Sequence, residues 1–373
     1  MIKKKFTIGL LLLATFFLSS CIREEAPNAE CDIIAVSEKW LQDNSSFLSG
    51  KPVVKNSEVW IYVKEGTDIG VLKGLEPVFE LTPGAHIIKG RTEENGERGI
   101  NMYYTTTSED GIWSKEYRVA FTIQSVIETG KPFSFENYTF QRYHIWHEVD
   151  AGGTELKWWA SGNAGFAFTG KKEFPTTVDS AGVQGCCVRL TTRDTGSFGN
   201  MAGMPIAAGN IFIGEFQSKS AMKAPLEATR FGLPILPTEP VSLRGYYKYT
   251  AGEVFTDKEK NPVENYKDTC AIYSVVYEIN PADVVTLDGS NVLSSERIVL
   301  VAQLENPGEP QEWTYFDIPY QNVNGKVFDK EKLQRGEYAI TVVASSSKNG
   351  AFFEGAVGST LMVDEIEIIW NNK

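Results

Sequence analysis

The sequence predicts an all-β protein in which two β-sandwich units follow a leader segment. Short runs rich in β-branched and aromatic residues recur along the chain between turn signals, and long helical periodicity is absent. From Trp113 to Ile123, most alternate positions are apolar, which is typical of a half-buried strand. A chain of 373 residues is long enough for two or three domains, and an aromatic share of 12% supplies large side chains for their cores.

Residues 1–20 have the pattern of a lipoprotein signal peptide. Lys3, Lys4 and Lys5 precede an uncharged apolar run, residues 6–18, that is too short to span a bilayer. Small residues directly before Cys21 resemble the lipobox of bacterial lipoproteins, which implies cleavage before Cys21 and lipidation of its thiol. The alternative is an ordinary signal peptide with an incidental cysteine. We expect a lipid anchor in the outer membrane, with residues 21–30 as a tether.

The segment after the cysteine carries the acidic pair Glu24-Glu25. It resembles the surface-export signal of lipoproteins from Gram-negative gut anaerobes, which implies a position on the cell surface. Cleavage would remove three lysines and no acid, so the net charge would change from -12 to -15. Nucleic acid is an unsuitable partner for such a chain, because binding phosphates requires clustered Lys and Arg.

The mature chain divides by pattern near residue 127. Residues 31–126 contain strand-like runs at 58–63, 78–81 and 113–123, and they match an immunoglobulin-like sandwich in size. A break at 128–132 follows, and residues 127–373 are predicted to form a larger jelly-roll sandwich. Its expected strands lie in residues 138–149, 155–160, 183–191, 210–216, 241–249, 271–279, 297–304, 313–319, 338–345 and 361–370.

The remaining cysteines, Cys31, Cys186, Cys187 and Cys270, would lie in a compartment that permits disulfides. Their pairing cannot be read from the sequence, and a bond between adjacent Cys186 and Cys187 would be strained. Buried free thiols are the favoured interpretation. No C-x-x-C motif supports a zinc or thiol-disulfide site.

Three segments, residues 159–165, 208–216 and 342–364, resemble a family of gut-bacterial lipoproteins known as the "putative carbohydrate metabolism domain". The resemblance extends over residues 31–373. It implies an immunoglobulin-like domain followed by a jelly roll similar to carbohydrate-binding modules, and a link to glycans without a defined reaction.

Glycan sites place the C–H face of a sugar on an aromatic ring and bond its hydroxyls to polar groups. Trp158 and Trp159 are adjacent on a predicted strand, so one could belong to the core while the other faces a groove. The alternative for each candidate is an ordinary core, loop or surface role. The candidate carbohydrate-binding residues are Trp158, Trp159, Asn163, Arg193, Tyr247 and Trp313.

Binding of glycan or oligosaccharide without catalysis, in polysaccharide acquisition, is the leading hypothesis. The first alternative is a glycoside hydrolase, which needs two carboxylates about 5 to 10 Å apart. Glu148 and Asp150 share a predicted strand face, and Glu215 is a further candidate. An adhesin or assembly subunit is the second alternative, and the sequence leaves open whether the chain is an enzyme.

No cofactor is required by this interpretation, although a structural calcium ion would suit acids at both ends of the larger unit. Glu136 and Asp364 are the predicted ligands, and a salt bridge or solvated acids are the alternative. Zinc is disfavoured because His144 and His147 would diverge on a strand. The Gly-rich loop at 197–205 is interpreted either as a wall beside a ligand groove or as a cover over the end of the sandwich.

Overall fold

The computed structural model describes residues 27–49, 51–64, 67–94, 99–124, 126–150, 153, 155–280 and 285–371. Strands dominate this part of the chain, which confirms the predicted all-β class. The leader and the predicted lipidation site Cys21 lie outside the described residues. Within the described residues, no helix is both long and apolar enough to cross a membrane.

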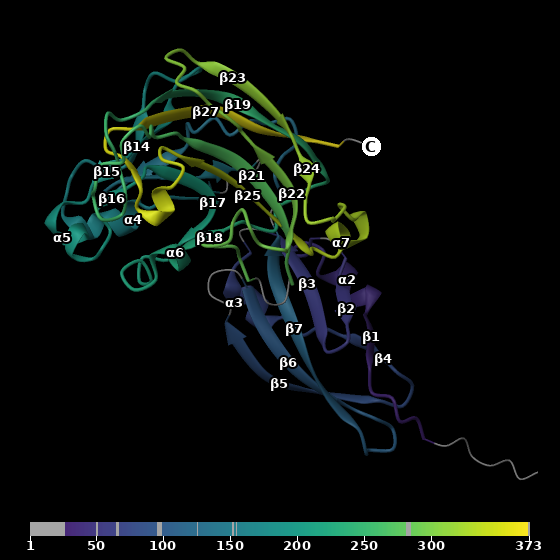
Figure 1. The fold of residues 1–373 in the computed structure, drawn as a ribbon. Coiled ribbons are helices and arrows are strands. Elements are labelled where there is room, and N and C mark those ends of the chain that lie inside the picture. Colours follow the sequence, from purple (N-terminus) through teal and green to yellow (C-terminus); the bar gives the residue numbers. More distant parts are fainter. Residues whose placement is uncertain are drawn as a thin grey trace, which may run out of the picture.

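The first unit is built on a five-stranded sheet in the order β2-β3-β7-β6-β5 (Figure 1). Its strands β3 and β7 run parallel, and the other pairs are antiparallel. A two-stranded ribbon of β1 and β4 accompanies it. The bounds are β1 Ile33–Val36, β2 Val53–Lys55, β3 Glu58–Lys64, β4 Phe79–Leu81, β5 His86–Glu94, β6 Gly99–Thr107 and β7 Ser114–Gln124.

Two short helices, α2 (Glu38–Asp43) and α3 (Ile69–Gly74), share the core of this unit. Trp40 of α2 and Leu72 of α3 are buried in one cluster with Ile100 and Phe121 of the sheet. Sequence patterning did not indicate these helices, because six residues are too few to display a helical period. The assignment of this unit as immunoglobulin-like stays a prediction.

The second unit is a sandwich of two antiparallel sheets. The seven-stranded sheet has the order β12-β17-β25-β21-β22-β24, with β18 also pairing with β17, and the five-stranded sheet has the order β13-β14-β27-β19-β23. The first comprises β12 Trp159–Ala160, β17 Asn210–Phe216, β18 Thr229–Phe231, β21 Ala271–Glu278, β22 Ile298–Gln303, β24 Gln321–Asn322 and β25 Tyr338–Ser345. The second comprises β13 Thr176–Asp179, β14 Cys187–Thr191, β19 Pro240–Thr250, β23 Thr314–Pro319 and β27 Thr360–Trp370.

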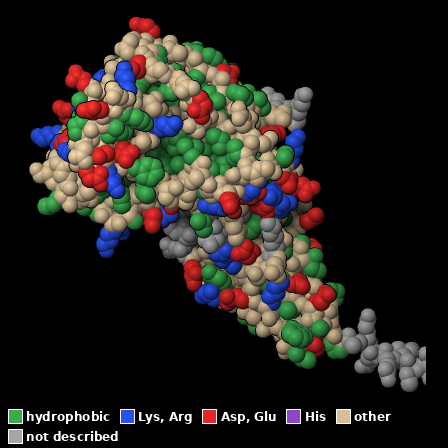
Figure 2. Space-filling model, viewed as in Figure 1, with side chains coloured by type: hydrophobic (Ala, Val, Ile, Leu, Met, Phe, Trp, Pro, Cys, Tyr) green, Lys and Arg blue, Asp and Glu red, His purple; other side chains and the backbone are tan. Residues whose placement is uncertain are grey.

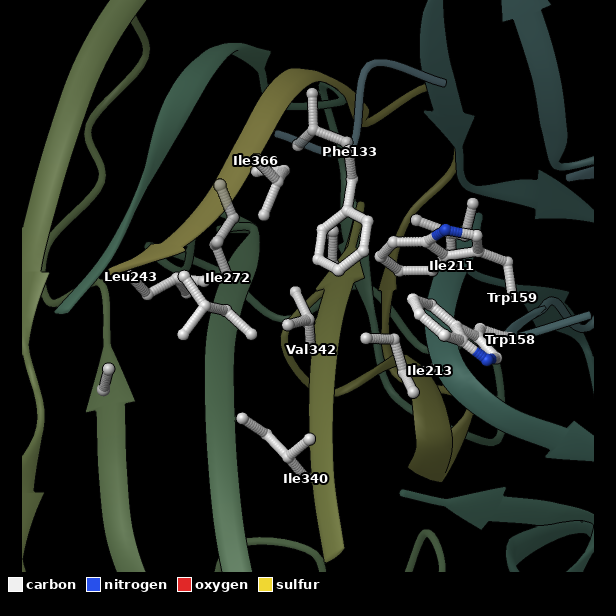
Figure 3. Packing of buried hydrophobic residues seen from close by; sticks show 14 of the residues in the cluster. Phe133, Trp158, Trp159, Ile211, Ile213, Leu243, Ile272, Ile340, Val342 and Ile366 are labelled. Atoms are coloured by element: carbon white, nitrogen blue, oxygen red, sulfur yellow. The ribbon is translucent and has the colours of Figure 1, made fainter. Parts of the chain in front are cut away.

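The main core lies between these two sheets (Figure 3). Strand β17 illustrates the alternation, since Ile211 and Ile213 point into this core while Phe212 belongs to a separate cluster on the outer face. Leu243 and Ile366 contribute from the five-stranded sheet. The seven-stranded sheet therefore has a second, outward apolar face.

Short elements surround the sandwich. They are β8 Tyr138–Phe140, β9 His144–Trp146, β10 Glu148–Val149, β11 Glu155–Leu156, β15 Arg193–Asp194, β16 Ile206–Ala207, β20 Phe255–Thr256, β26 Gly355–Ala356, α4 Asn163–Phe166, α5 Gly196–Met201, α6 Pro225–Ala228, α7 Lys330–Gln334, and the 3-10 turns η2 Ala167–Thr169 and η3 Gly350–Phe352. Of these, α4, α5, α6 and η3 lie around one face of the seven-stranded sheet (Figure 1).

The two units contact each other through the first unit's sheet. Tyr62 of β3 is buried and donates its hydroxyl hydrogen bond to the carbonyl of Arg335, directly after α7. The backbone N–H of Ile127 donates to the carbonyl of Ile235 at 2.9 Å. The boundary predicted at 126/127 falls between the last strand of one unit and the first strand of the other, and as a domain assignment it stays a prediction.

The four described cysteines are free thiols. Cys31, Cys187 and Cys270 are buried, and Cys186 is partly buried. This agrees with the favoured interpretation from the sequence.

Candidate functional site

A hollow of about 200 Å³ lies on the outer face of the seven-stranded sheet, and Figure 2 shows hydrophobic side chains gathered in it. Its floor is made by outward-facing residues of three neighbouring strands. Phe212 comes from β17, Tyr273 from β21 and Val343 from β25. The pleat of the sheet requires this arrangement, because the residues on either side of each one point into the sandwich core.

Helical segments and loops form the walls of the hollow. Phe166 comes from α4, Phe198 from α5, Met222 from the loop before α6, and Phe353 follows η3. Phe198 is 41% exposed, so its ring is accessible at the rim. Because Phe198 and Met204 line the hollow, the Gly-rich loop at 197–205 forms part of its wall, which was one of the two interpretations from the sequence.

The backbone of Phe353 has a φ of +63°, in the left-handed region that an aromatic residue rarely adopts. Such strain persists where the surrounding structure enforces it, and it is common at functional sites. Here it accompanies a ring placed in the wall of the hollow.

Few polar groups reach the hollow, and three of them are available to a ligand. Within the described residues, the Tyr273 hydroxyl and the Lys348 ammonium have no hydrogen-bond or ion-pair partner. Asn210 accepts a 2.8 Å hydrogen bond from the N–H of Gly162 through Oδ1, and its Nδ2 has no acceptor in the described part of the chain. No aspartate or glutamate is among the described residues that line the hollow.

A buried carboxylate supports the wall that carries Lys348. Oδ2 of Asp268 accepts hydrogen bonds from Ser347 Oγ at 2.6 Å, Ser359 Oγ at 2.7 Å and the Ala356 N–H at 2.8 Å. Burial raises the pKa of Asp268, although these donors oppose the shift. Sequence reasoning missed Asp268. The serine run at 345–347 was the signal that such an acceptor was needed.

The two adjacent tryptophans are both buried, at 4% exposure for Trp158 and 5% for Trp159. Figure 3 shows both beside Phe133, whose ring meets them edge to face at 6.4 Å and 5.1 Å between centroids. Trp159 also lines a pocket of about 150 Å³ and Trp158 one of about 40 Å³, so the expectation that one of them faces a groove stays a prediction. Trp159 lies on the two-residue strand β12 and Trp158 precedes it, so a strand's alternation does not govern them and both pack into the core.

Asn163 and Tyr247 also have structural roles. The buried side-chain amide of Asn163 donates to the carbonyl of Thr176 at 2.8 Å and accepts from its N–H at 3.1 Å. Tyr247 lies in the sandwich core, and its hydroxyl donates to the carbonyl of Pro307 at 2.6 Å. Both are buried and lie outside the lining of the hollow, and their role as ligand contacts stays a prediction.

The last two predicted contacts lie outside the lining of the hollow. Arg193 pairs with Glu173 at 3.0 Å. Trp313 borders the five-stranded sheet, donates from its indole to the carbonyl of Ala181 at 3.1 Å, and is covered by the Lys248 ammonium 5.1 Å above the ring. None of the six predicted carbohydrate-binding residues therefore lines the hollow.

The candidate catalytic acids are only partly brought together. Glu148 and Asp150 border a pocket of about 40 Å³ with Trp158, room for a few water molecules. Burial raises the pKa of Glu148 to about 7, while a hydrogen bond from Trp159 and the charge of Lys131 limit the shift. Glu215 is exposed on β17 opposite Arg230, apart from that pocket.

The predicted calcium ligands meet at the same loop. Asp364 is buried and accepts from the N–H groups of Val183 at 2.7 Å and Glu365 at 2.9 Å, while Glu136 accepts from the N–H of Cys186 at 2.6 Å. These neighbours present N–H donors to the carboxylates, so the surroundings fit carboxylates held by backbone amides rather than by a cation. In the described part, no group of three or more His, Cys, Asp or Glu could hold a metal ion.

A concave recess that is mostly apolar and carries a few polar groups has the usual form of a small-molecule binding site. The chain belongs to the family described as "Putative carbohydrate metabolism domain", whose model matches residues 134–369. The family resemblance seen in the three sequence segments is thereby confirmed.

Two solved structures are similar along much of the chain. One, from Bacteroides thetaiotaomicron, is described as a "putative glycoside hydrolase"; it is 40% identical, with 94% of this chain and 100% of that chain covered and a TM-score of 0.64. The other, from Bacteroides vulgatus and described in the same words, is 40% identical, with 66% and 100% covered and a TM-score of 0.60. No curated protein matches the chain.

Proposed function

We propose that this protein binds carbohydrate in the hollow on the seven-stranded sheet. One observation carries the proposal: the three segments that bear the family resemblance meet there. Gly162 and Gly165 come from the first segment, Asn210 and Phe212 from the second, and the stretch 343–353 from the third. Segments far apart in the chain thus contribute to one recess in a carbohydrate-related domain.

The lining suits a sugar ring. Aromatic and aliphatic side chains offer surfaces for C–H faces and apolar substituents, and Tyr273, Asn210 and Lys348 offer groups for hydroxyl or carboxylate oxygens. Lys348 is the charged side chain among the lining residues described, and no acid opposes it. We therefore favour a glycan with a carboxylate and an apolar substituent such as an acetamido methyl.

Binding is favoured over hydrolysis. Cleavage of a glycosidic bond by the common mechanism needs two carboxylates about 5 to 10 Å apart, whereas no carboxylate is found among the described residues around the hollow. The names of the two solved relatives keep glycoside hydrolysis as the second candidate. It would use Glu148, whose pKa of about 7 suits a general acid, with Asp150 in the same small pocket.

The proposed setting is the outer surface of the cell, with a lipid on Cys21 as the anchor and polysaccharide acquisition as the process. The signal-like leader and the acidic pair after Cys21 support this setting. A role as adhesin or assembly subunit is the alternative, and it predicts protein rather than glycan partners.

The test is a glycan array with the full chain, followed by titration calorimetry on the best ligands. Tyr273→Phe removes one hydroxyl and should weaken binding about 3- to 10-fold, the effect of one neutral hydrogen bond. Lys348→Met should weaken binding of acidic sugars about tenfold and neutral sugars little. Lys51→Met, an exposed lysine of the first unit, is the matched control. An array without binding, or binding that both hollow variants leave unchanged, would overturn the proposal.

A further inference from the structure

The turn between β6 and β7, residues 108–113, exposes two adjacent apolar side chains. A 3.0 Å hydrogen bond from the N–H of Ser108 to the carbonyl of Trp113 closes the turn, and Gly111 adopts a φ of +71° within it. Ile112 is 74% exposed and Trp113 is 60% exposed. Trp113 therefore differs from the other seven tryptophans, of which six are buried and one is partly buried.

The two acids of this turn already accept hydrogen bonds. Oδ1 of Asp110 accepts from Ser108 Oγ at 2.5 Å and from the N–H of Ile112 at 2.9 Å, and these bonds lower the pKa of Asp110. Oε2 of Glu109 accepts from the N–H of Asn28 at 2.8 Å. The turn contains no Lys or Arg, so attraction to an anionic partner is not what it offers. Its apolar side chains remain as the groups available to a partner.

The start of the described chain is fixed beside this turn. Besides the bond from its N–H to Glu109, Asn28 donates from Nδ2 to the carbonyl of Pro83 at 3.3 Å. Pro83 is exposed and belongs to the turn between β4 and β5. A Cβ on Gly84 would approach the Glu109 side chain to 2.7 Å, so this glycine lets the two turns meet. The two turns and the segment at Asn28 thus form one tip of the first unit.

This tip is within reach of the proposed anchor. Cys21 precedes Asn28 by seven residues, which can span about 25 Å at most. Figure 1 shows the described chain beginning at the end of the first unit that is remote from the second unit, and Figure 2 shows hydrophobic side chains at that end. A lipid on Cys21 would therefore hold the surface that bears Ile112 and Trp113 close to the bilayer.

We infer that this tip is a membrane-docking surface, whose Ile112 and Trp113 side chains insert into the interfacial layer of the bilayer that holds the anchor. The inference rests on the proposed lipid at Cys21 and is independent of glycan binding. An indole suits the boundary between headgroups and acyl chains, because its ring is apolar and its N–H is polar. Lipid and tip together give two points of attachment. The first unit then stands on the membrane and holds the second unit, with its hollow, away from the bilayer.

The test uses the full chain, produced with its leader and reconstituted into vesicles of phosphatidylcholine that is brominated on its acyl chains. Mass spectrometry of the vesicle-bound protein reports whether Cys21 carries a lipid. Bromine quenches an indole only at close approach, so the exposed Trp113 serves as the reporter. We expect weaker tryptophan emission in brominated than in unbrominated vesicles. Trp113→Phe should lose this difference, and Trp313→Phe, which removes a partly buried tryptophan of the second unit, should keep it.

A second pair of variants leaves the reporter in place. Ile112→Asp puts a charge at the tip, so its quenching should fall to the level of Trp113→Phe. Val327→Asp, at a side chain of the second unit that is 75% exposed, is the matched control and should be quenched like the wild type. If the lipidated protein is on the vesicles but Trp113→Phe and Ile112→Asp are quenched like the wild type, the inference is overturned and the anchor stands. A protein without lipid on Cys21 rejects the anchor and the inference together, and the glycan array still tests the hollow.

Discussion

Trp159 donates a 2.8 Å hydrogen bond from its indole Nε1 to Oε1 of Glu148, and both side chains are buried. A carboxyl group that sequence reasoning treats as a candidate catalyst is thereby linked to a core tryptophan. Burial is the main cause that raises the pKa of Glu148 to about 7. The folded state consequently favours the protonated acid, and the free energy of unfolding depends on pH.

Glu148→Gln should make the protein more stable at pH 8 and flatten its pH profile. With a folded pKa near 7 and an ordinary value of 4.5, the stabilisation by the neutral acid is fully present below pH 4.5 and is lost as the pH rises through 7. The upper limit of the loss is about 3 kcal/mol. Glutamine stays neutral and can still accept from Trp159. Denaturant unfolding from pH 4 to 8 measures the effect, and an unchanged profile would contradict it.

Asn163→Ala should destabilise the fold by about 2 to 4 kcal/mol, because it leaves the buried N–H and carbonyl of Thr176 without partners. Urea unfolding measures the loss. Asn322→Ala, an exposed residue of β24, is the matched control and should change stability by less than about 0.5 kcal/mol. Equal stabilities of the two variants would show that the two hydrogen bonds between Asn163 and Thr176 contribute little to the stability of the fold.

Calcium should have no effect on thermal unfolding. Both oxygens of Asp364 and Oε1 of Glu136 already accept hydrogen bonds from backbone N–H groups, so removal of calcium leaves these oxygens with partners. Melting temperatures in millimolar EGTA and in millimolar calcium chloride are expected to agree. A clear rise with calcium that Asp364→Asn abolishes would instead establish the ion site predicted from the sequence.

Asp268→Asn should weaken glycan binding as well as stability. Oδ2 of Asp268 accepts from Ser347, Ser359 and Ala356, and Oδ1 accepts from the N–H of Thr269 at 2.9 Å. Asparagine has an NH2 group in place of one of these oxygens, so donors on one side lose their acceptor and the segment that carries Lys348 is held less firmly. Calorimetry under conditions where the variant remains folded separates the two effects. Asp257→Asn, in an exposed turn, is the control. Unaltered glycan binding by the folded Asp268→Asn variant would show that Asp268 does not support the binding site.

The fold class could be predicted from the sequence, because strand patterns such as the alternation in β7 depend on local period alone. Helices α2 and α3 could not, since a single turn or two carries no measurable period. The three family segments were also recognisable, and they turned out to line the hollow.

The binding residues were less accessible to sequence reasoning. Tryptophans 158 and 159 were chosen for ring size, but burial depends on the tertiary packing around Phe133, which no local pattern reveals. Tyr273 and Phe212 were missed because a strand pattern shows only which residues share a face. It does not show which outer face of the folded sandwich carries a hollow. Asn163 had the right chemistry for a sugar contact, yet it serves the backbone of Thr176.

The most direct test of the central claim is a crystal structure of the full chain with the best-bound oligosaccharide. The account predicts that a sugar unit lies on the outer face of the seven-stranded sheet, within hydrogen-bond distance of the Tyr273 hydroxyl and the Lys348 ammonium. A glycan bound elsewhere, with its glycosidic bond between Glu148 and Asp150, would contradict the claim and support hydrolysis instead.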